Sequence, residues 1–129
     1  MSDADDIEEI RKKKIEALQA RVNTPNQPVY VESGAHLDEL LESHRLVLVD
    51  FYADWCGPCK MLEPTVNELA AETDAAVAKV DIDAHQQLAQ TYQVQGVPTL
   101  YLFVDGEPAE RLVGVQDKSS LVELIERHG

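Results

Sequence analysis

Cysteine is scarce in this chain of 129 residues, which contains only Cys56 and Cys59. The length fits one domain with a short extension. With 44% hydrophobic residues, such a domain can bury a core without disulfide staples. We therefore do not expect the two cysteines to be present for stability alone.

Long hydrophobic runs are also absent. The longest apolar block, residues 46–49, has the length of a strand and falls far short of the roughly 18 residues of a membrane span. The N-terminus is acidic, then basic at residues 11–14, with no apolar centre or cleavage-like site of a secretory signal. We expect a soluble, cytoplasmic protein without a membrane partner. In that reducing compartment a cysteine pair is more often catalytic, redox-active or metal-binding than structural.

Basic residues are few, and the net charge is −13. Residues 1–24 hold six acids and five bases, whereas residues 25–129 hold 18 acids and six bases. This negative field is expected to repel nucleic acid and anionic membranes. It fits adaptation to high salt, where screening relieves self-repulsion. An ordinary acidic, well-solvated surface explains the same charge.

The chain divides at residues 28 and 29. Residues 5–22 predict an amphipathic helix, and residues 24–28 form a linker with two prolines. The apolar stripe of that helix could dock on the domain, pair with another chain or hold a partner, although we favour a loosely ordered charged tail. Its members are Ile7, Ile10, Ile15, Leu18 and Val22.

From residue 29 onward, strand and helix patterns alternate. We expect strands at residues 29–31, 46–53, 76–82, 98–104 and 110–115, and helices from Ser33 or Gly34 and at 59–73, 88–92 and 119–127. Asp105-Gly106 is typical of a two-residue hairpin turn. Ser120 and Glu123 have capping-box spacing. The order predicts an α/β fold, with a central mixed sheet flanked by helices on both faces.

Cys56 and Cys59 lie between a predicted strand and the start of a predicted helix. A helix N-terminus carries unpaired N–H groups and partial positive charge, which stabilise a thiolate. The thiolate is the species that attacks disulfides. We expect Cys56 to be the exposed nucleophile, and Cys59, one turn further, to be the more buried resolving thiol.

A cysteine pair of this kind could also bind zinc or be inert. A structural zinc site usually needs four ligands, and the four histidines have no ligand-like spacing with the pair; they are His36, His44, His85 and His128. We therefore expect no metal. An inert buried pair is the second alternative. A two-residue spacing next to a βαβ pattern favours a redox motif over both.

Three blocks carry a resemblance to a known family. The segment VDFYADWCGPCK at residues 49–60 resembles the active-site signature of the thioredoxins, and so do GVPTL at residues 96–100 and Val113-Gly114. The order and spacing of the blocks match from residue 29 to the C-terminus, and residues 1–28 lie outside the resemblance. It implies a thioredoxin fold with an N-terminal helical extension.

The resemblance implies a thiol–disulfide oxidoreductase that reduces protein disulfides. Cys56 attacks the substrate, Cys59 displaces it, and the Cys56–Cys59 disulfide that results is the redox-active group, with no bound cofactor. A thioredoxin reductase recycles the protein. We expect a monomer. A redox-inactive scaffold is the alternative, although a scaffold has no need for both cysteines.

Asp50 and Lys79 are expected to assist the cysteines. Asp50 is a single acid inside an apolar strand, so its pKa should be raised unless it turns to solvent at the strand end. By resemblance it is the buried carboxylate that helps deprotonate Cys59. Lys79 matches the family lysine near that carboxylate, or else it is an ordinary exposed lysine.

The resemblance also assigns a substrate groove. Pro98 is expected as a cis proline facing the cysteines, although without the resemblance a trans proline opening an edge strand is favoured. The Val97 backbone could pair with an extended substrate, and Thr99 belongs to the same block. Trp55 is expected to be an apolar platform, or else core packing. Gly114 would admit a partner backbone, or else be a bulge glycine.

Gly57 and Pro58 separate the cysteines and are expected to tune the redox potential. A Gly-Pro pair resembles the reducing thioredoxins, whereas oxidising relatives and isomerases tend to carry a histidine there. The sequence therefore favours a reductant.

Overall fold

Strands and helices alternate along the chain in the predicted order. The computed structural model describes Arg11 and residues 24–129. Its elements are β1 (Val29–Tyr30), α2 (Gly34–Ser43), β2 (Leu46–Tyr52), α3 (Gly57–Glu72), β3 (Ala76–Asp81), α4 (Gln86–Thr91), β4 (Thr99–Val104), β5 (Glu107–Val113) and α5 (Lys118–His128). The helix expected over residues 5–22 lies outside the described residues, apart from Arg11.

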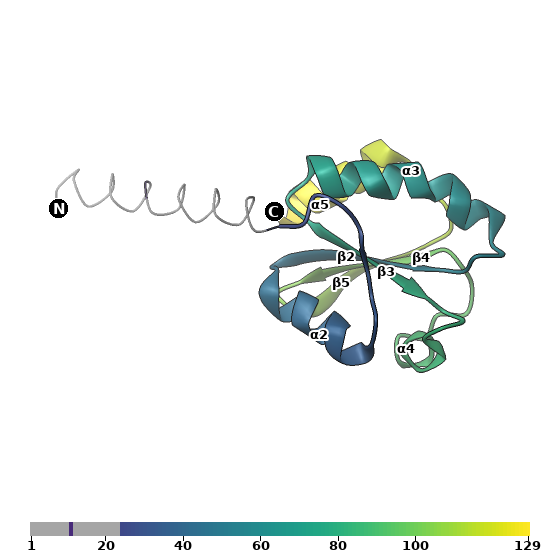
Figure 1. The fold of residues 1–129 in the computed structure, drawn as a ribbon. Coiled ribbons are helices and arrows are strands. Elements are labelled where there is room, and N and C mark those ends of the chain that lie inside the picture. The colour runs from purple at the N-terminus through teal and green to yellow at the C-terminus, as the bar shows by residue number, and fades with distance from the viewer. Residues whose placement is uncertain (1–10, 12–23) are drawn as a thin grey trace.

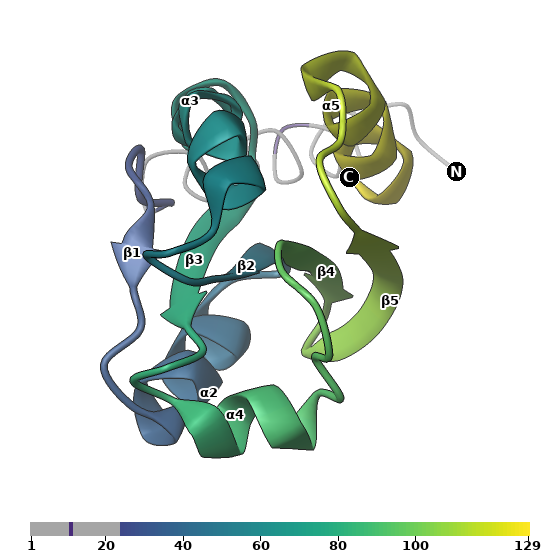
Figure 2. The ribbon, with the colours of Figure 1, turned by 90° about the vertical axis from the view of Figure 1, so that its right-hand side faces the viewer.

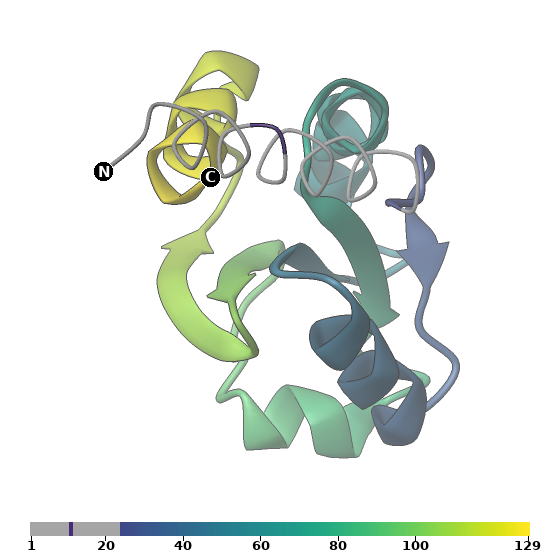
Figure 3. The ribbon, with the colours of Figure 1, turned by 90° about the vertical axis from the view of Figure 1, so that its left-hand side faces the viewer.

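The strands form one mixed sheet in the order β1-β3-β2-β4-β5 (Figure 1). β1 and β2 run parallel to β3, and β4 and β5 add antiparallel pairs. The two end-on views show α3 and α5 side by side on one face and α2 and α4 on the other (Figures 2 and 3). The predicted α/β architecture is therefore confirmed.

β2 carries the centre of the core because both of its faces are covered. Successive residues point to opposite faces of a strand, so Leu46 and Leu48 share one face and pack in the cluster that contains residues of α3 and α5. Val47 and Phe51 pack with the cluster that contains Leu37 of α2. This alternation puts Asp50 on the same face as Leu48, under α3.

The hairpin differs from the prediction at its second strand. Asp105 and Gly106 form the turn, both with positive φ, as the two-residue hairpin requires. β5 then begins at Glu107, three residues before the predicted start. The strand includes Pro108, which is compatible with an edge strand because its missing N–H can face solvent there. A register shift next to Phe103 accommodates the extra residue.

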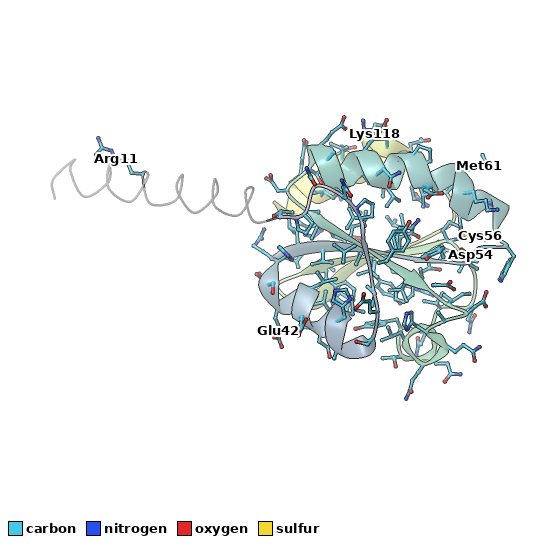
Figure 4. The ribbon with its side chains drawn as sticks, viewed as in Figure 1. Arg11, Glu42, Asp54, Cys56, Met61 and Lys118 are labelled. Carbon is cyan, nitrogen blue, oxygen red and sulfur yellow. A yellow bond between two sulfur atoms is a disulfide. The ribbon has the colours of Figure 1, made fainter. Side chains whose placement is uncertain are left out.

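The expected capping box at the last helix is wrong. α5 begins at Lys118 with Asp117 as its N-cap, so Ser120 already lies inside the first turn, and the Asp117 side chain makes no capping hydrogen bond. Lys118 ion-pairs with Glu68 at 3.3 Å and Glu72 at 2.6 Å (Figure 4). The start of α5 is therefore held to α3 by ion pairs and not by a capping box.

None of the helices in the described part of the chain is long and apolar enough to cross a membrane.

Candidate active site

Cys56 and Cys59 form a disulfide at the start of α3. The helix begins at Gly57, two residues before the predicted start, so Gly57 and Pro58 make up its first positions. Proline is well suited there because its missing N–H has no helical partner to lose. Cys56 is the N-cap, and its Sγ accepts the backbone N–H of Cys59 at 3.1 Å. The sulfur of Cys56 thus occupies the position where a helix stabilises negative charge.

Burial does not distinguish the two cysteines, contrary to our expectation. Cys56 is 4% exposed and Cys59 is 5% exposed. The Sγ of Cys56 lies 3.7 Å from the carbonyl oxygen of Val97, so the chain before β4 covers the sulfur from one side. The position of Cys56 at the cap, and not its exposure, is what sets it apart from Cys59.

The segment before β4 faces the disulfide. The Val97–Pro98 bond is cis, which excludes a trans proline at the start of this strand. The N–H of Gly114 donates to the carbonyl of Pro98 at 2.8 Å. Gly114 has a φ of +93° and follows the last residue of β5, so a residue with a side chain would be strained there. Gly114 therefore lies against Pro98, and the neighbouring Val97 lies against Cys56.

Thr99 is not on this surface. Its side chain is fully buried, and its Oγ1 donates to the carbonyl of Gly96 at 2.6 Å. The expectation that Thr99 contacts a substrate is therefore wrong for its side chain, which instead holds the preceding loop.

Trp55 is exposed, at 70% of its surface, which excludes core packing. Its Nε1 donates to Oδ2 of Asp83 at 2.9 Å. Met61 is also largely exposed and lies at the same end of the domain as Cys56 and Asp54 (Figure 4). We did not predict Asp83 or Met61. A long apolar side chain off the buried stripe of α3 was the available indication for Met61.

Asp50 lies buried in the middle of β2, only 1% exposed, so it does not turn to solvent. Among Arg11 and residues 24–129, no protein group forms a hydrogen bond with either of its carboxyl oxygens. Burial raises the pKa of Asp50 from 3.8 to about 6, the positive charge of Lys79 opposes the rise, and the negative charge of Glu63 adds to it. The pKa expectation from the sequence therefore holds.

Lys79 is directly across from Asp50 on β3 in the parallel register and is only 5% exposed, so it is not an ordinary surface lysine. Its Nζ lies 4.0 Å from Oε1 of Glu63. It also lies over two aromatic rings, 4.5 Å from the centre of Tyr52 and 5.3 Å from that of Tyr30. These three neighbours were missed, although Tyr52 shares the β2 face of Asp50 and Tyr30 pairs in register with Lys79.

A small cavity of about 110 Å³ lies between Lys79 with its neighbours and Cys59. It is lined by Tyr30, Tyr52, Ala53, Asp54, Cys59, Lys60, Glu63 and Lys79. Among Arg11 and residues 24–129, no three His, Cys, Asp or Glu residues are placed to hold a metal ion. The chemistry available in this region is therefore that of a dithiol pair with a nearby acid.

Known proteins share both the fold and this site. The family model described as Thioredoxin matches residues 27–127. A thioredoxin of Chlamydia trachomatis is 54% identical over 84 residues, which cover 64% of this chain and 82% of that protein. A thioredoxin of Mycobacterium tuberculosis is 45% identical over 96 residues, which cover 73% of this chain and 83% of that protein.

A solved structure gives the same result. A mutant thioredoxin from Halobacterium salinarum superimposes with a TM-score of 0.80 at 55% identity, covering 81% of this chain and 93% of that chain. The family model spans most of the chain, and the Cys56–Cys59 disulfide supplies the redox group, so no bound cofactor is needed. The chain therefore belongs to the thioredoxin family and is a thiol–disulfide oxidoreductase.

Proposed function

We propose that this protein reduces protein disulfides with Cys56 as the attacking sulfur. The observation that carries this assignment is the hydrogen bond from the Cys59 N–H to the Cys56 Sγ at the helix N-terminus. The same bond stabilises a thiolate on Cys56 in the dithiol form. Cys59 lies inside the first turn and is the resolving thiol.

The reaction transfers two electrons from the dithiol to the substrate. The Cys56 thiolate attacks one substrate sulfur, and the substrate disulfide breaks as a mixed disulfide forms; the released sulfur takes up a proton. The Cys59 thiol then gives its proton to the Asp50 carboxylate and attacks Cys56. The Cys56–Cys59 bond forms, and the second substrate sulfur leaves and is protonated.

Asp50 suits the role of proton acceptor because its pKa of about 6 lies close to neutral pH, where a general base is most effective. Lys79 lies beside it and tunes its charge. The proposed substrate groove consists of Trp55, Val97, Pro98 and Gly114, of which Val97 lies against Cys56. An extended substrate segment pairs with the Val97 backbone in this arrangement.

The Gly57-Pro58 pair supports the proposal that the protein is a reductant, and its redox potential tests this. We expect a potential near −270 mV, the value typical of thioredoxin. The measurement is equilibration with glutathione redox buffers followed by separation of the thiol and disulfide forms. The Pro58→His variant is the matched control, because a histidine there stabilises the thiolate and makes the potential less negative. A potential of the unchanged protein above about −200 mV would place it with the oxidants and isomerases.

The finer assignments follow from this role. The protein acts as a cytoplasmic monomer, accepts electrons from a thioredoxin reductase and passes them to disulfides of other proteins. Neither nucleic acid nor a membrane surface is a partner, because the acidic charge repels both.

Residues 29–129 make up the thioredoxin domain, and residues 1–28 are an extension, which agrees with the match to residues 27–127. Residues 25–129 carry a balance of −12 charges, against −1 for residues 1–24. The proposed adaptation to high salt therefore concerns the acidic residues of the domain and not those of the extension. The resemblance to the Halobacterium salinarum protein supports this proposal.

One melting experiment tests the domain boundary and the salt proposal together. We expect the full chain and a chain of residues 25–129 to have the same melting temperature, and both to melt several degrees higher in 2 M KCl than in 0.1 M KCl. The Debye length falls from about 10 Å at 0.1 M to about 3 Å at 1 M, so acidic self-repulsion is screened. Sorbitol at equal water activity is the control without screening. An unchanged or lower melting temperature in KCl would contradict salt adaptation, and a melting temperature lowered by the deletion would contradict the boundary.

A further inference from the structure

Lys79 and Asp50 face each other on neighbouring strands, yet they do not form a hydrogen-bonded pair. Within the part of the chain that the structure describes, neither carboxyl oxygen of Asp50 has a hydrogen-bond partner on the protein. The Lys79 ammonium instead lies 4.0 Å from the carboxylate of Glu63. A buried cation and a buried acid in register would ordinarily pair, so something holds the ammonium away from Asp50.

Glu63 and the two tyrosine rings together account for this position. Glu63 lies one helical turn after Cys59 on α3, and 46% of its side chain is exposed, so its charge remains solvated. The rings of Tyr52 and Tyr30 lie 4.5 and 5.3 Å from the Lys79 Nζ and add a cation–π attraction. Burial raises the pKa of Tyr52 to about 12, so its ring is neutral at every working pH.

We propose that Glu63 is a positioning residue for the resolving step: it draws the Lys79 ammonium toward itself and leaves the Asp50 carboxyl unpaired, ready to exchange a proton with Cys59. This inference rests on the proposed function, since it assigns a task to Asp50 in that reaction. It adds a residue of α3 to the cluster formed by β2 and β3.

The sign of the effect follows from two contributions that act in the same direction. The negative charge of Glu63 disfavours a second negative charge on Asp50. Its hold on Lys79 also keeps the compensating positive charge at a distance. Removal of the Glu63 charge therefore favours ionised Asp50 on both counts, which makes Asp50 a weaker base toward the Cys59 thiol.

Charged and titratable groups from four elements and the loop after β2 surround this cluster. Besides burial, the charges of Lys79 and Glu63 shift the pKa of Asp50, and the carboxylates around Tyr52 raise the pKa of its hydroxyl. The groups are Tyr30 on β1, Tyr52 on β2, Asp54 after β2, Lys79 and Asp81 on β3, and Cys59, Lys60 and Glu63 on α3. Of these groups, Glu63 forms the ion pair with the Lys79 ammonium, at 4.0 Å.

A cavity lies between Cys59 and the Lys79–Glu63 pair. Cys59, Lys79 and Glu63 all line the space of about 110 Å³, and a polar cavity of this size accommodates water. Water in this space would lie between Cys59 and Glu63, whose side chain is half exposed.

The test is the protonation midpoint of Asp50, followed by the ¹³C resonance of its carboxyl carbon against pH in the oxidised full chain. In Glu63→Gln we expect the midpoint to fall by roughly one unit. Glu68→Gln is the matched control, because it removes the same charge from α3 but breaks only a contact with Lys118; its midpoint is expected to stay unchanged. In Lys79→Met the Asp50 midpoint is expected to rise. Adding Glu63→Gln to Lys79→Met should lower the midpoint by less than Glu63→Gln lowers it in the parent.

An unchanged midpoint in Glu63→Gln would overturn the inference, and so would an equal fall in Glu68→Gln. An equal Glu63 effect with and without Lys79 would show that the charge acts directly and not by positioning the ammonium. A second readout is the pH profile of the resolving step, whose acidic limb should move down with the midpoint in Glu63→Gln. The carboxyl titration uses unreacted protein, so its failure leaves disulfide reduction untouched, and a protein without reductase activity still reports the titration.

Discussion

Replacing Cys56 by serine is expected to bring insulin reduction by dithiothreitol down to the uncatalysed rate, a loss on the order of 10³-fold or more. The serine hydroxyl stays protonated at neutral pH, so the helix N-terminus has no anion to stabilise. The Cys59 N–H that now reaches the Cys56 Sγ at 3.1 Å would donate to a neutral oxygen. The measurement is the turbidity of reduced insulin against time.

Cys59→Ser is the matched variant, and it separates the two roles. Its Cys56 still attacks, so one equivalent of substrate should remain attached as a mixed disulfide, visible by mass spectrometry. Turnover should fall about as far as in Cys56→Ser, because the resolving thiol is missing. The two variants therefore have the same loss of rate but different products.

The pair of variants also distinguishes an enzyme from a scaffold. If Cys56→Ser retained the biological role of the protein while losing insulin reduction, the thiols would be dispensable and the chain would act by binding. A mixed disulfide formed by Cys56→Ser and not by Cys59→Ser would exchange the assigned roles. Equal burial of the two sulfurs makes this a real test, since exposure does not decide between them.

The sequence predicted those features that depend on local pattern. β2 reads as a continuous apolar run with one acid, and both its strand character and the burial of Asp50 follow from that pattern. The hairpin turn at Asp105-Gly106 follows from residues that accept positive φ. Patterns of this kind predict structure that is determined by residues close together in the sequence.

Features that depend on contacts across the fold were missed. Nothing near Glu63 in the sequence indicates that its carboxylate meets Lys79, because that contact is made only when α3 packs over β3. The same holds for the Trp55–Asp83 hydrogen bond, which joins residues 28 positions apart. Thr99 failed in the opposite way: its place in a motif suggested contact with substrate, but the β4 register turns its side chain into the core.

The Asp50→Asn variant is expected to be more stable than the parent at pH 8 and no more stable at pH 4. An Asp50 pKa of about 6 in the folded protein, against 3.8 for the unperturbed group, means that ionising this buried carboxyl opposes folding. A difference of about two units corresponds to about 3 kcal/mol at alkaline pH. The buried amide of asparagine keeps unpaired groups of its own, so we expect a gain of about 1–3 kcal/mol.

The pH window fixes the sign. Between about pH 4 and 6 the folded protein holds a proton on Asp50 that the unfolded chain has released, so the parent loses stability as the pH rises through this range. Below it both states are protonated, and above it both are ionised. The Asn variant lacks this part of the slope, while all other carboxylates contribute equally to both proteins. Denaturant unfolding of the oxidised proteins at pH 4, 6 and 8 measures the difference.

Asp54→Asn is the control, because it removes one negative charge from an exposed residue beside the same site. Its stability should change by less than about 0.5 kcal/mol, with no special dependence between pH 4 and 6. If Asp50→Asn were destabilising at pH 8, the buried carboxylate would have a partner that compensates its burial.

The gain in stability of Asp50→Asn should come with slower resolution of the mixed disulfide, by roughly tenfold to a hundredfold at pH 7, since the amide accepts no proton from Cys59. A stable variant with slow resolution would mean that the protein retains a destabilising buried acid because the reaction needs it.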